Sequence, residues 1–366
     1  MRVGWYVHHH GAGHRTRARV LADEMATRGH RVTLLGSGRE SSGAFPKLVD
    51  TVALSMDSPL DGAGPERRAD VTVGGLLHWA PLRHSGFRDR MTHLAAWVRE
   101  HQPDVFVVDV SSEVAVLVRL LGVPVVVVAQ PGDRRDAGHR AALAAASAVL
   151  APWPEWATTD LWRTGVSTGQ QEDSSAVVAA VGGITRTPEP ALEGTPEPAP
   201  DASAGSASAV RAVRTSVTPR LRGLVLAGAE GFDTPGLVDA VTRSVTDVDW
   251  MVADGRHWVP DVRRALSGTD VVVTHAGQNA VAEVALAGVP AVVVPQQRPF
   301  GEQDHMGACL AASGLAVVVP RRAVGETEWA GTVARALRTG GGAWARWGCE
   351  GAVARAVDVL EGVAHG

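Results

Sequence analysis

The chain has 366 residues, of which 45% are apolar, and its formal net charge at pH 7 is -4. This length favours two domains with sizeable cores, and the slightly acidic balance argues against a nucleic-acid binder that works by neutralising phosphates. No apolar stretch approaches the ~20 residues of a membrane-spanning helix, and the N-terminus lacks the apolar segment and cleavage site of a signal peptide.

Two residue types narrow the choice of chemistry. Lysine occurs once, as Lys47, so the chain holds no GxxxxGK[ST] loop, which excludes P-loop kinases and ATPases. The two cysteines, Cys309 and Cys349, have no CxxC spacing. This usage predicts a reduced, cytoplasmic location.

Short β-rich runs alternate with helical patterns through the first half of the chain. The alternation is typical of a parallel sheet that is covered on both faces. The helix expected at 16–28 would turn Ala18, Leu21, Ala22 and Met25 inward. The other predicted helices lie at 113–121 and 140–146, and the predicted strands at 2–7, 30–36, 104–109, 123–129, 147–152 and 176–184.

The composition then changes to a Pro-, Ala- and Ser-rich stretch, which predicts a linker over residues 185–218. Strand patterns resume at 222–228, 249–255, 270–277, 289–295 and 315–320, and a helix is predicted from 343 to the end of the chain. We therefore expect an N-terminal domain (1–184), a linker, and a second domain (219–342). Both domains should be doubly wound α/β sheets, with ligands bound at the carboxyl ends of the strands in a cleft between them.

The turn after residues 270–274 carries the sharpest functional signal. The strand ends in His275-Ala276-Gly277, and a helix is expected to begin near Gln278 or Asn279. The free N–H groups and the positive dipole end of such a helix suit a pyrophosphate. His275 could add a donor to this site.

Other residues around this turn could bind the rest of a nucleotide sugar. Glu283, one turn inside the helix, could accept hydrogen bonds from a ribose diol, and Trp258 offers a face for base stacking. Glu302 and Gln303 could contact sugar hydroxyls. Taken singly, each of these residues is more often a packing or solvated residue, but no packing requirement links all of them at this spacing.

The segment from Trp258 to Gln303 resembles the nucleotide-sugar box of GT-B glycosyltransferases, the group that includes UDP-glycosyltransferases and the GlcNAc transferase of lipid II synthesis. The offset from His275 to Glu283 is eight, as in that group, and Asp261 replaces the usual glutamine. The matching positions are Trp258, Pro260, His275, Gly277, Asn279, Glu283, Gly288-Val289-Pro290 and Glu302-Gln303. The resemblance implies a GT-B fold, in which two Rossmann-like domains face an interdomain cleft and the final helix crosses back to brace the N-terminal domain.

Four histidines fall within seven positions near the N-terminus: His8, His9, His10 and His14. An affinity tag rarely sits between an apolar strand and a helical pattern. A metal site is disfavoured because successive strand side chains point to opposite faces, and no zinc-ligand motif is present. We expect His8 and His9 either to pack in the interior or to support the residues that contact the substrate, and His10 to face an acceptor.

His14 follows the turn Gly11-Ala12-Gly13 at the carboxyl end of the first strand, which is a ligand-facing position in a doubly wound domain. The resembled group places a general base at a matching histidine, and an imidazole can accept a hydroxyl proton near neutral pH. Plant relatives orient that base with an aspartate, a role that the resemblance gives to Asp109. The alternative for Asp109 is an N-cap, with Ser111 or Ser112 as competing caps.

An acceptor pocket is expected in the N-terminal domain, from the loops at 76–87 and 129–139. His78 and Trp79 are the candidate contacts. Arg83, Arg134 or Arg135 could meet an anionic group, although solvated arginines are the favoured interpretation.

Three functions remain open from the sequence. The first is an inverting, metal-independent glycosyltransferase that uses a UDP-sugar, with dTDP- and GDP-sugars as further possibilities, and needs no cofactor. The second is a UDP-sugar 2-epimerase on the same fold, and the third is a non-catalytic nucleotide-sugar-binding subunit. The acceptor would be a small molecule, a glycan or a lipid-linked group, and the chain a monomer or homodimer that binds no nucleic acid.

Overall fold

The fold is described here from a computed structural model, in residues 1–9, 12–37, 47–58, 70–164, 176–185, 220–228, 231–254, 259 and 261–366. Most of the predicted linker lies outside these ranges. His10, Trp258 and Pro260 also lie outside the described residues, so their predicted roles are not addressed by the structure.

The N-terminal domain is built on a seven-stranded parallel sheet in the order β3-β2-β1-β4-β5-β7-β9. Its strands are β1 Arg2–Val7, β2 Arg31–Gly36, β3 Val49–Ala53, β4 Val105–Asp109, β5 Val125–Val128, β7 Ala148–Ala151 and β9 Val177–Ala180, and a separate two-stranded ladder pairs β6 Gly132–Asp133 with β8 Trp162–Arg163. The helices are α1 Gly13–Thr27, α2 Ser85–His101, α3 Ser112–Leu120, α4 Ala137–Ala145, the 3-10 helix η2 Glu155–Ala157 and α5 Thr158–Leu161.

The C-terminal domain holds a five-stranded parallel sheet in the order β11-β10-β12-β13-β14. Its strands are β10 Leu221–Leu226, β11 Val248–Ala253, β12 Val271–Thr274, β13 Ala291–Val293 and β14 Val317–Val318. The helices are α6 Leu237–Ser244, α7 Val262–Ser267, α8 Gln278–Ala287, η3 Pro299–Gly301, α9 Glu302–Ala312, η4 Arg321–Glu326, α10 Trp329–Thr339, η5 Gly342–Trp347 and α11 Ala352–His365.

The predicted α/β architecture with two parallel sheets is confirmed. Helix α1 begins at Gly13, three residues before the predicted start. Its predicted inner face is correct, because all four of the residues expected to point inward are buried: Ala18, Leu21, Ala22 and Met25. The helix therefore covers the sheet through the stripe that its sequence periodicity indicated.

The prediction of one continuous helix from residue 343 is wrong. A 3-10 helix, η5, occupies Gly342–Trp347, and α11 starts only at Ala352. Gly348 and Gly351 between them both have φ of 68°. Glycine adopts this left-handed conformation without a Cβ penalty, so the chain changes direction here.

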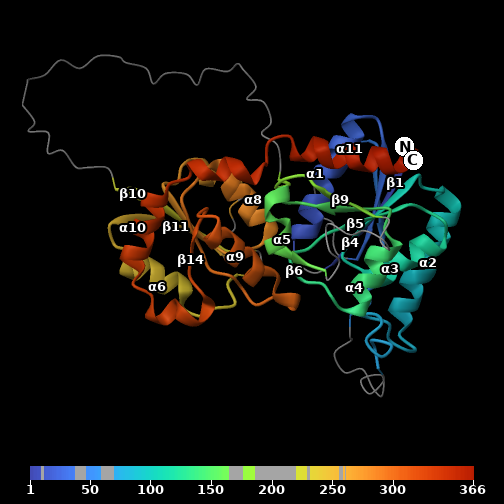
Figure 1. The fold of residues 1–366 in the computed structure, drawn as a ribbon, viewed down its shortest axis with the longest axis horizontal. Coiled ribbons are helices and arrows are strands. Elements are labelled where there is room, and N and C mark those ends of the chain that lie inside the picture. The colour runs from blue at the N-terminus through green and yellow to red at the C-terminus, as the bar shows by residue number, and fades with distance from the viewer. Residues whose placement is uncertain are drawn as a thin grey trace, which may run out of the picture.

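Helix α11 returns to the N-terminal domain and lies along α1, as Figure 1 shows. Its apolar stripe, which includes Val357 and Leu360, belongs to the same buried cluster as Leu21 of α1. Two polar contacts fix its position: Arg28 Nη1 lies 2.6 Å from Asp358, and His30 Nε2 lies 2.7 Å from Glu361. The last helix thus completes a core that the N-terminal sheet begins.

The two domains also share an apolar interface. One buried cluster combines Trp153 and Leu161 of the N-terminal domain with Met306 and Leu310 of α9. Contacts between α5 and α9 belong to this interface. The domains therefore pack against each other in addition to being joined by α11.

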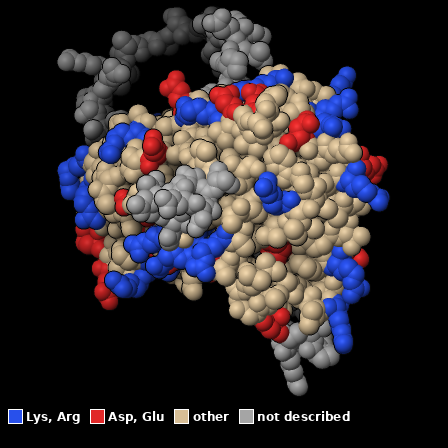
Figure 2. Space-filling view, turned by 45° about the vertical axis from the view of Figure 1, so that its right-hand side comes forward, with Lys and Arg blue, Asp and Glu red and all other residues tan. Residues whose placement is uncertain are grey.

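Acidic and basic side chains are interspersed over the face shown in Figure 2. This mixture agrees with the small net charge of the chain. Within the described part of the chain, no helix is both long and apolar enough to cross a membrane.

Candidate active site

The strand order of the N-terminal sheet reverses between β1 and β4. The chain first adds β2 and β3 on one side of β1, and then returns to place β4 on the other side. The last residues of the two strands, Val7 and Asp109, are partners in the ladder. Ligands bind at such switch points in doubly wound sheets, so the segments that follow β1 and β4 converge at the expected place.

His14 and Asp109 meet at this switch point. His14 lies in the first turn of α1, and its Nδ1 is 2.9 Å from Asp109 Oδ1. A carboxylate can only accept, so Nδ1–H donates and Nε2 is left as the basic nitrogen. The Asp109 side chain is fully buried, whereas that of His14 is 20% exposed. The predicted contact is present, and the imidazole keeps an open side.

The N-cap alternative for Asp109 is wrong. Helix α3 is capped by Ser111, whose Oγ accepts a hydrogen bond from the N–H of Val114 at 3.2 Å. Asp109 ends β4 two residues earlier, and its oxygens point to side chains of α1 and to Gln130 Nε2, which lies 3.3 Å from Oδ1.

Arg17 is a site residue that the sequence reasoning missed. Its Nη2 donates to Asp109 Oδ1 at 2.8 Å and its Nε to Oδ2 at 3.1 Å. Burial acts to raise the pKa of Asp109, but Arg17 and His14 hold it well below the usual range, so the carboxylate stays ionised. The sequence did contain a signal for Arg17. It lies three residues after His14, and residues i and i+3 of a helix share one face.

The first two residues of α8 reach across to the N-terminal domain. Gln278 Oε1 accepts a hydrogen bond from Arg17 Nη1 at 2.8 Å, and Asn279 Nδ2 donates to the carbonyl of Gly13 at 3.0 Å. Both side chains were predicted to hold the donor. In the structure they instead link the start of α8 to the start of α1, because the two helix ends face each other.

The backbone at the start of α8 has the form expected of an anion site. Gly277 is the N-cap in an extended conformation, and the first helical hydrogen bond runs from Val281 N–H to the Gly277 carbonyl. The N–H groups of residues 278–280 therefore have no partner inside the helix. A Cβ on Gly277 would lie 2.6 Å from the ring of His275, so glycine is required at this turn.

His275 supports the turn and is held as a neutral imidazole. Its Nδ1 accepts the Gly277 N–H at 2.9 Å, which places the ring proton on Nε2. Burial lowers the pKa of His275 to about 4, and the nearby Arg298 adds to this effect. The predicted donor role is thereby limited to Nε2, which faces the loop after β10 near Gly228.

The sugar contacts predicted for Glu302 and Gln303 are corrected in part. Gln303 is buried, and its Oε1 accepts hydrogen bonds from the N–H groups of Ala276, at 3.1 Å, and Gln296, at 2.9 Å. It ties two loops together, which leaves only its amide nitrogen for a ligand. Glu302 is half-buried at the start of α9, where its charge acts on Arg134 of the other domain.

Two further motif residues have clear places. Glu283 lies half-buried on α8, one turn beyond the proposed anion site. Asp261, which departs from the expected glutamine, is the N-cap of α7 and accepts a hydrogen bond from Arg264 N–H at 3.0 Å. The departure thus has a local structural reason.

A cavity of about 280 Å³ opens at the carboxyl end of β1, where His8, and not His14 itself, belongs to its lining. The ring of His8 belongs to its wall and packs edge-on against the ring of His14, with centroids 5.8 Å apart. The contact between His8 and His14 agrees with the supporting role expected for His8, and both His8 and His9 also line the cavity. The candidate acceptor residues His78 and Trp79 line it as well. The lining residues are Tyr6, His8, His9, Asp57, Ser58, His78, Trp79, Phe87, Val110, Ser111 and Glu113.

The ligand atoms of His78, Asp136 and His139 lie within 4.8 Å of one another, a spacing that could hold a metal. Asp136 instead bridges the two rings, 2.7 Å from His78 Nε2 and 2.5 Å from His139 Nδ1. Arg134 Nη1 lies 3.1 Å from His139 Nε2 and must donate to it, so the His139 proton is on Nδ1. Burial also lowers the pKa of His139 to about 4, which keeps its ring neutral. These directed hydrogen bonds favour a structural role for the three residues.

Two of the three arginines considered for an anionic acceptor are already engaged within the protein. Arg134 is buried, donates to the Pro131 carbonyl at 2.8 Å and stacks on Phe300. Arg135 is exposed and paired with Asp133. Arg83 is exposed as well.

Comparisons with known proteins agree with this layout. Residues 251–335 match the glycosyltransferase family 28 C-terminal domain, a span that contains the α8 turn. The UDP-N-acetylglucosamine–N-acetylmuramyl-(pentapeptide) pyrophosphoryl-undecaprenol N-acetylglucosamine transferase of Nitratidesulfovibrio vulgaris is 31% identical over 129 residues, which make up 34% of this chain. The chain matches 35% of that relative's length.

Solved structures are similar over the whole chain. The glycosyltransferase of kitacinnamycin aligns with a TM-score of 0.66 and 17% identity over 99% of both chains. The spinosyn rhamnosyltransferase complexed with thymidine diphosphate aligns with a TM-score of 0.61 and 17% identity over 99% of this chain and 100% of the other. The chain therefore has the GT-B fold, and its C-terminal domain resembles that of the family 28 glycosyltransferases.

Proposed function

We propose that this protein is an inverting glycosyltransferase that moves a sugar from a nucleoside diphosphate to a hydroxyl acceptor. The observation that carries the proposal is the contact between the two domains. The His14–Asp109 pair is linked through Arg17 to Gln278, the first residue of α8. A base and an anion-binding helix end are thereby brought together, as transfer between two bound substrates requires.

The donor half of the site is proposed to be the start of α8. A diphosphate there would accept hydrogen bonds from the N–H groups of residues 278–280 and would benefit from the helix dipole. The matched family 28 domain and the curated relative, whose name specifies UDP-N-acetylglucosamine, favour a UDP-sugar. The thymidine diphosphate in the spinosyn enzyme makes a dTDP-sugar the second choice.

The chemistry assigned to the residues is a single displacement. His14 Nε2 takes the proton of the acceptor hydroxyl, and the acceptor oxygen forms a bond to the anomeric carbon. The bond between that carbon and the diphosphate breaks, and its electron pair leaves with the diphosphate, which the N–H groups of α8 stabilise. Asp109 holds the His14 ring in the orientation that leaves Nε2 free to take the proton. Attack on the face opposite the leaving group inverts the anomeric configuration.

The experiment combines donor binding with product analysis. Calorimetric titration with UDP, dTDP and GDP should show one nucleotide bound most tightly, because the base contacts select it. Incubation with the matching sugar nucleotide, alone and with a panel of hydroxyl acceptors, is then followed by NMR. A glycoside formed only when acceptor is present supports the transferase. An epimerised sugar from donor alone indicates a 2-epimerase, and binding without turnover a non-catalytic subunit.

A further inference from the structure

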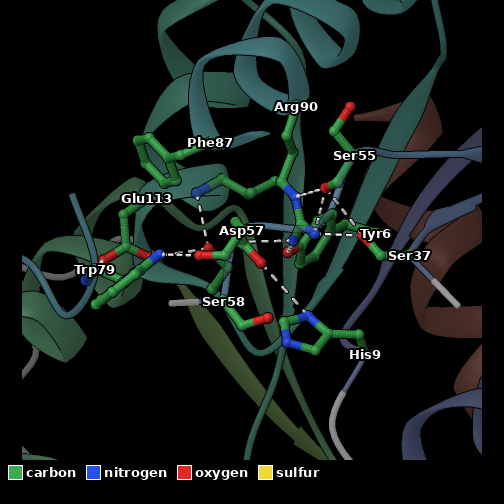
Figure 3. Close-up of polar contacts among 12 residues, drawn as sticks. Tyr6, His9, Ser37, Ser55, Asp57, Ser58, Trp79, Phe87, Arg90 and Glu113 are labelled. Carbon is green, nitrogen blue, oxygen red and sulfur yellow. Dashed lines mark hydrogen bonds and ion pairs between the residues drawn. The ribbon is translucent and has the colours of Figure 1, made fainter. Parts of the chain in front are cut away.

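The cavity at the carboxyl end of β1 is bounded by side chains from four segments of the N-terminal domain, shown in part in Figure 3. Its volume of about 280 Å³ is near the lower end for small-molecule sites (~300–1,000 Å³) and suits a group of about the size of one sugar. Because the His8 ring lies in its wall and against His14, a hydroxyl of the occupant can lie close to the proposed base.

Two carboxylates, Asp57 and Glu113, line this cavity, and no Arg or Lys lines it among the described residues. Arg90 stands behind Asp57, with its Nη1 2.9 Å from Asp57 Oδ2 (Figure 3). Arg90 is 1% exposed and also donates to the Ser55 carbonyl at 2.8 Å and to the Tyr6 hydroxyl at 2.5 Å. Its charge is used to hold Asp57 and is shielded from the cavity.

Glu113 has no cation to balance it in the part of the chain that the structure describes. Its Oε1 accepts the backbone N–H groups of His78, at 2.7 Å, and Trp79, at 2.9 Å, and its Oε2 accepts the Ser111 hydroxyl at 2.9 Å. These three donors are neutral. They orient the carboxylate but supply no positive charge to balance it.

Asp57 contributes negative charge to the cavity wall rather than an open acceptor. Its Oδ1 is buried and accepts no hydrogen bond from the described residues. Nδ1 of His9 lies 3.6 Å from that oxygen, which is ion-pair distance but beyond hydrogen-bond distance (Figure 3). The carboxylate therefore acts on an occupant of the cavity through its charge.

Aromatic side chains complete the wall. Trp79 and Phe87 line the cavity on the same side as Glu113 (Figure 3), and the Trp79 Nε1 donates to the Asp57 carbonyl at 2.6 Å, which fixes the ring. Aromatic faces attract ammonium groups through the ring quadrupole. Carboxylates and aromatic faces together favour a cation, and both disfavour a phosphate or a carboxylate.

We infer that this cavity selects an acceptor that carries a protonated amine beside its hydroxyls, of the size of an amino sugar or amino alcohol, and that it rejects anionic acceptors. The inference rests on the proposed function, because only a glycosyltransferase would use this cavity as an acceptor site. The amine lies between Glu113, Asp57 and the aromatic rings, and a hydroxyl of the same molecule points past His8 to His14.

The test uses three probes that differ only at C6 of one sugar: methyl 6-amino-6-deoxyglucoside, methyl glucoside and methyl glucuronide. Isothermal titration calorimetry at pH 7 measures the dissociation constant of each for the full-length protein. We expect the amine to bind about tenfold more tightly than the neutral glycoside, because an unbalanced carboxylate lies close to it, and the glucuronide to bind most weakly. Equal affinities, a preference for the glucuronide, or no binding of the amine would overturn the inference.

A matched pair of variants tests whether the preference for the amine comes from Glu113 in the cavity wall. Glu113→Gln removes the charge but keeps an oxygen for the two backbone N–H groups, and it should abolish the tenfold preference. Glu100→Gln, an exposed position on α2, should retain it. If Glu113→Gln does not fold, the wild-type ranking of the three probes decides.

The titration needs neither donor nor turnover, so it separates the two proposals. A protein that prefers the amine but transfers no sugar to any acceptor contradicts the glycosyltransferase and leaves the cation site intact. A protein that transfers sugar but binds the amine no better than the neutral probe contradicts only the cation site.

Discussion

Arg17 brings a full positive charge to the pair of residues proposed to activate the acceptor. Its side chain is 2% exposed, and its hydrogen bonds to Asp109 and Gln278 join the two domains. With Arg17 already opposite the carboxylate, Asp109 gives the imidazolium of His14 less charge stabilisation than an unpaired carboxylate would. Its main contribution is to fix the ring, which is the role of a positioning residue.

Replacing Arg17 should destabilise the protein strongly. Arg17→Gln leaves the Asp109 carboxylate buried without its cation, and breaking one side of such a buried pair costs about 3–5 kcal/mol. Urea denaturation measures the change in the free energy of unfolding. Arg15→Gln, an exposed position on the same helix, is the control and should change this free energy by less than about 0.5 kcal/mol. Equal effects of the two substitutions would contradict the assigned role of Arg17.

Two half-buried histidines should make stability depend on pH. Burial lowers the pKa values of His139 and His275 from 6.5 to about 4 in the folded protein. Between pH 4 and 6.5 these histidines bind more protons in the unfolded chain than in the folded protein. The stability that they contribute is therefore fully present above about pH 6.5 and is lost as the pH falls towards 4. The urea concentration at the midpoint of unfolding, measured between pH 7.5 and 4.5, should therefore fall as the pH is lowered. His275→Gln should make this dependence on pH shallower, and an unchanged slope in that variant would show that His275 is not held neutral.

At the scale of elements, the turn between β12 and α8 was largely readable from the sequence. The strand end, the glycine turn and a helix start near residue 278 follow from local residue preferences, and all three are present. The partners of the side chains were not readable. Gln278 bonds to Arg17 and Gln303 to Ala276 because distant segments meet in the folded chain, and local patterns carry no information about such contacts.

The turn itself can be tested through Gly277. In Gly277→Ala, the new Cβ would lie 2.6 Å from Cε1 of His275 and 2.8 Å from its Nδ1. Such overpacking costs about 1–3 kcal/mol, and moving the turn displaces the N–H groups of α8. We expect lower stability in urea and weaker nucleoside diphosphate binding by calorimetry. Gly325→Ala is the control, because a Cβ there meets no atom within 4 Å. Unaltered nucleotide affinity in Gly277→Ala would argue against diphosphate binding at this turn.

At the scale of the whole molecule, the residue patterns indicated two α/β domains, and only the resemblance implied that the final helix braces the N-terminal domain. The apolar pattern from residue 343 continues through two tryptophans, so it suggested one helix. Trp344 and Trp347 instead fill the core shared by both domains, and α11 begins after the glycines that follow. Which domain an apolar face covers depends on packing at long range, which the pattern alone does not specify.

Helix α11 should be essential for the stability of the N-terminal domain. Leu360 is fully buried in the cluster that α11 shares with α1, so Leu360→Ala should lower the free energy of unfolding by about 2–5 kcal/mol. Leu120, which is 79% exposed, provides the matched control, and Leu120→Ala should change it by less than about 0.5 kcal/mol. A small effect at Leu360, measured by urea or thermal unfolding, would mean that α11 is only loosely attached in solution.

The most direct measurement compares His14→Ala with the wild-type protein in two assays, sugar transfer to an acceptor and calorimetric binding of the nucleoside diphosphate. The proposed base lies in one domain and the proposed diphosphate site in the other. We therefore expect turnover to fall at least ~100-fold, as for loss of a general base, while the dissociation constant of the nucleotide changes less than about twofold. A His14→Ala protein that transfers sugar at the wild-type rate would contradict the mechanism.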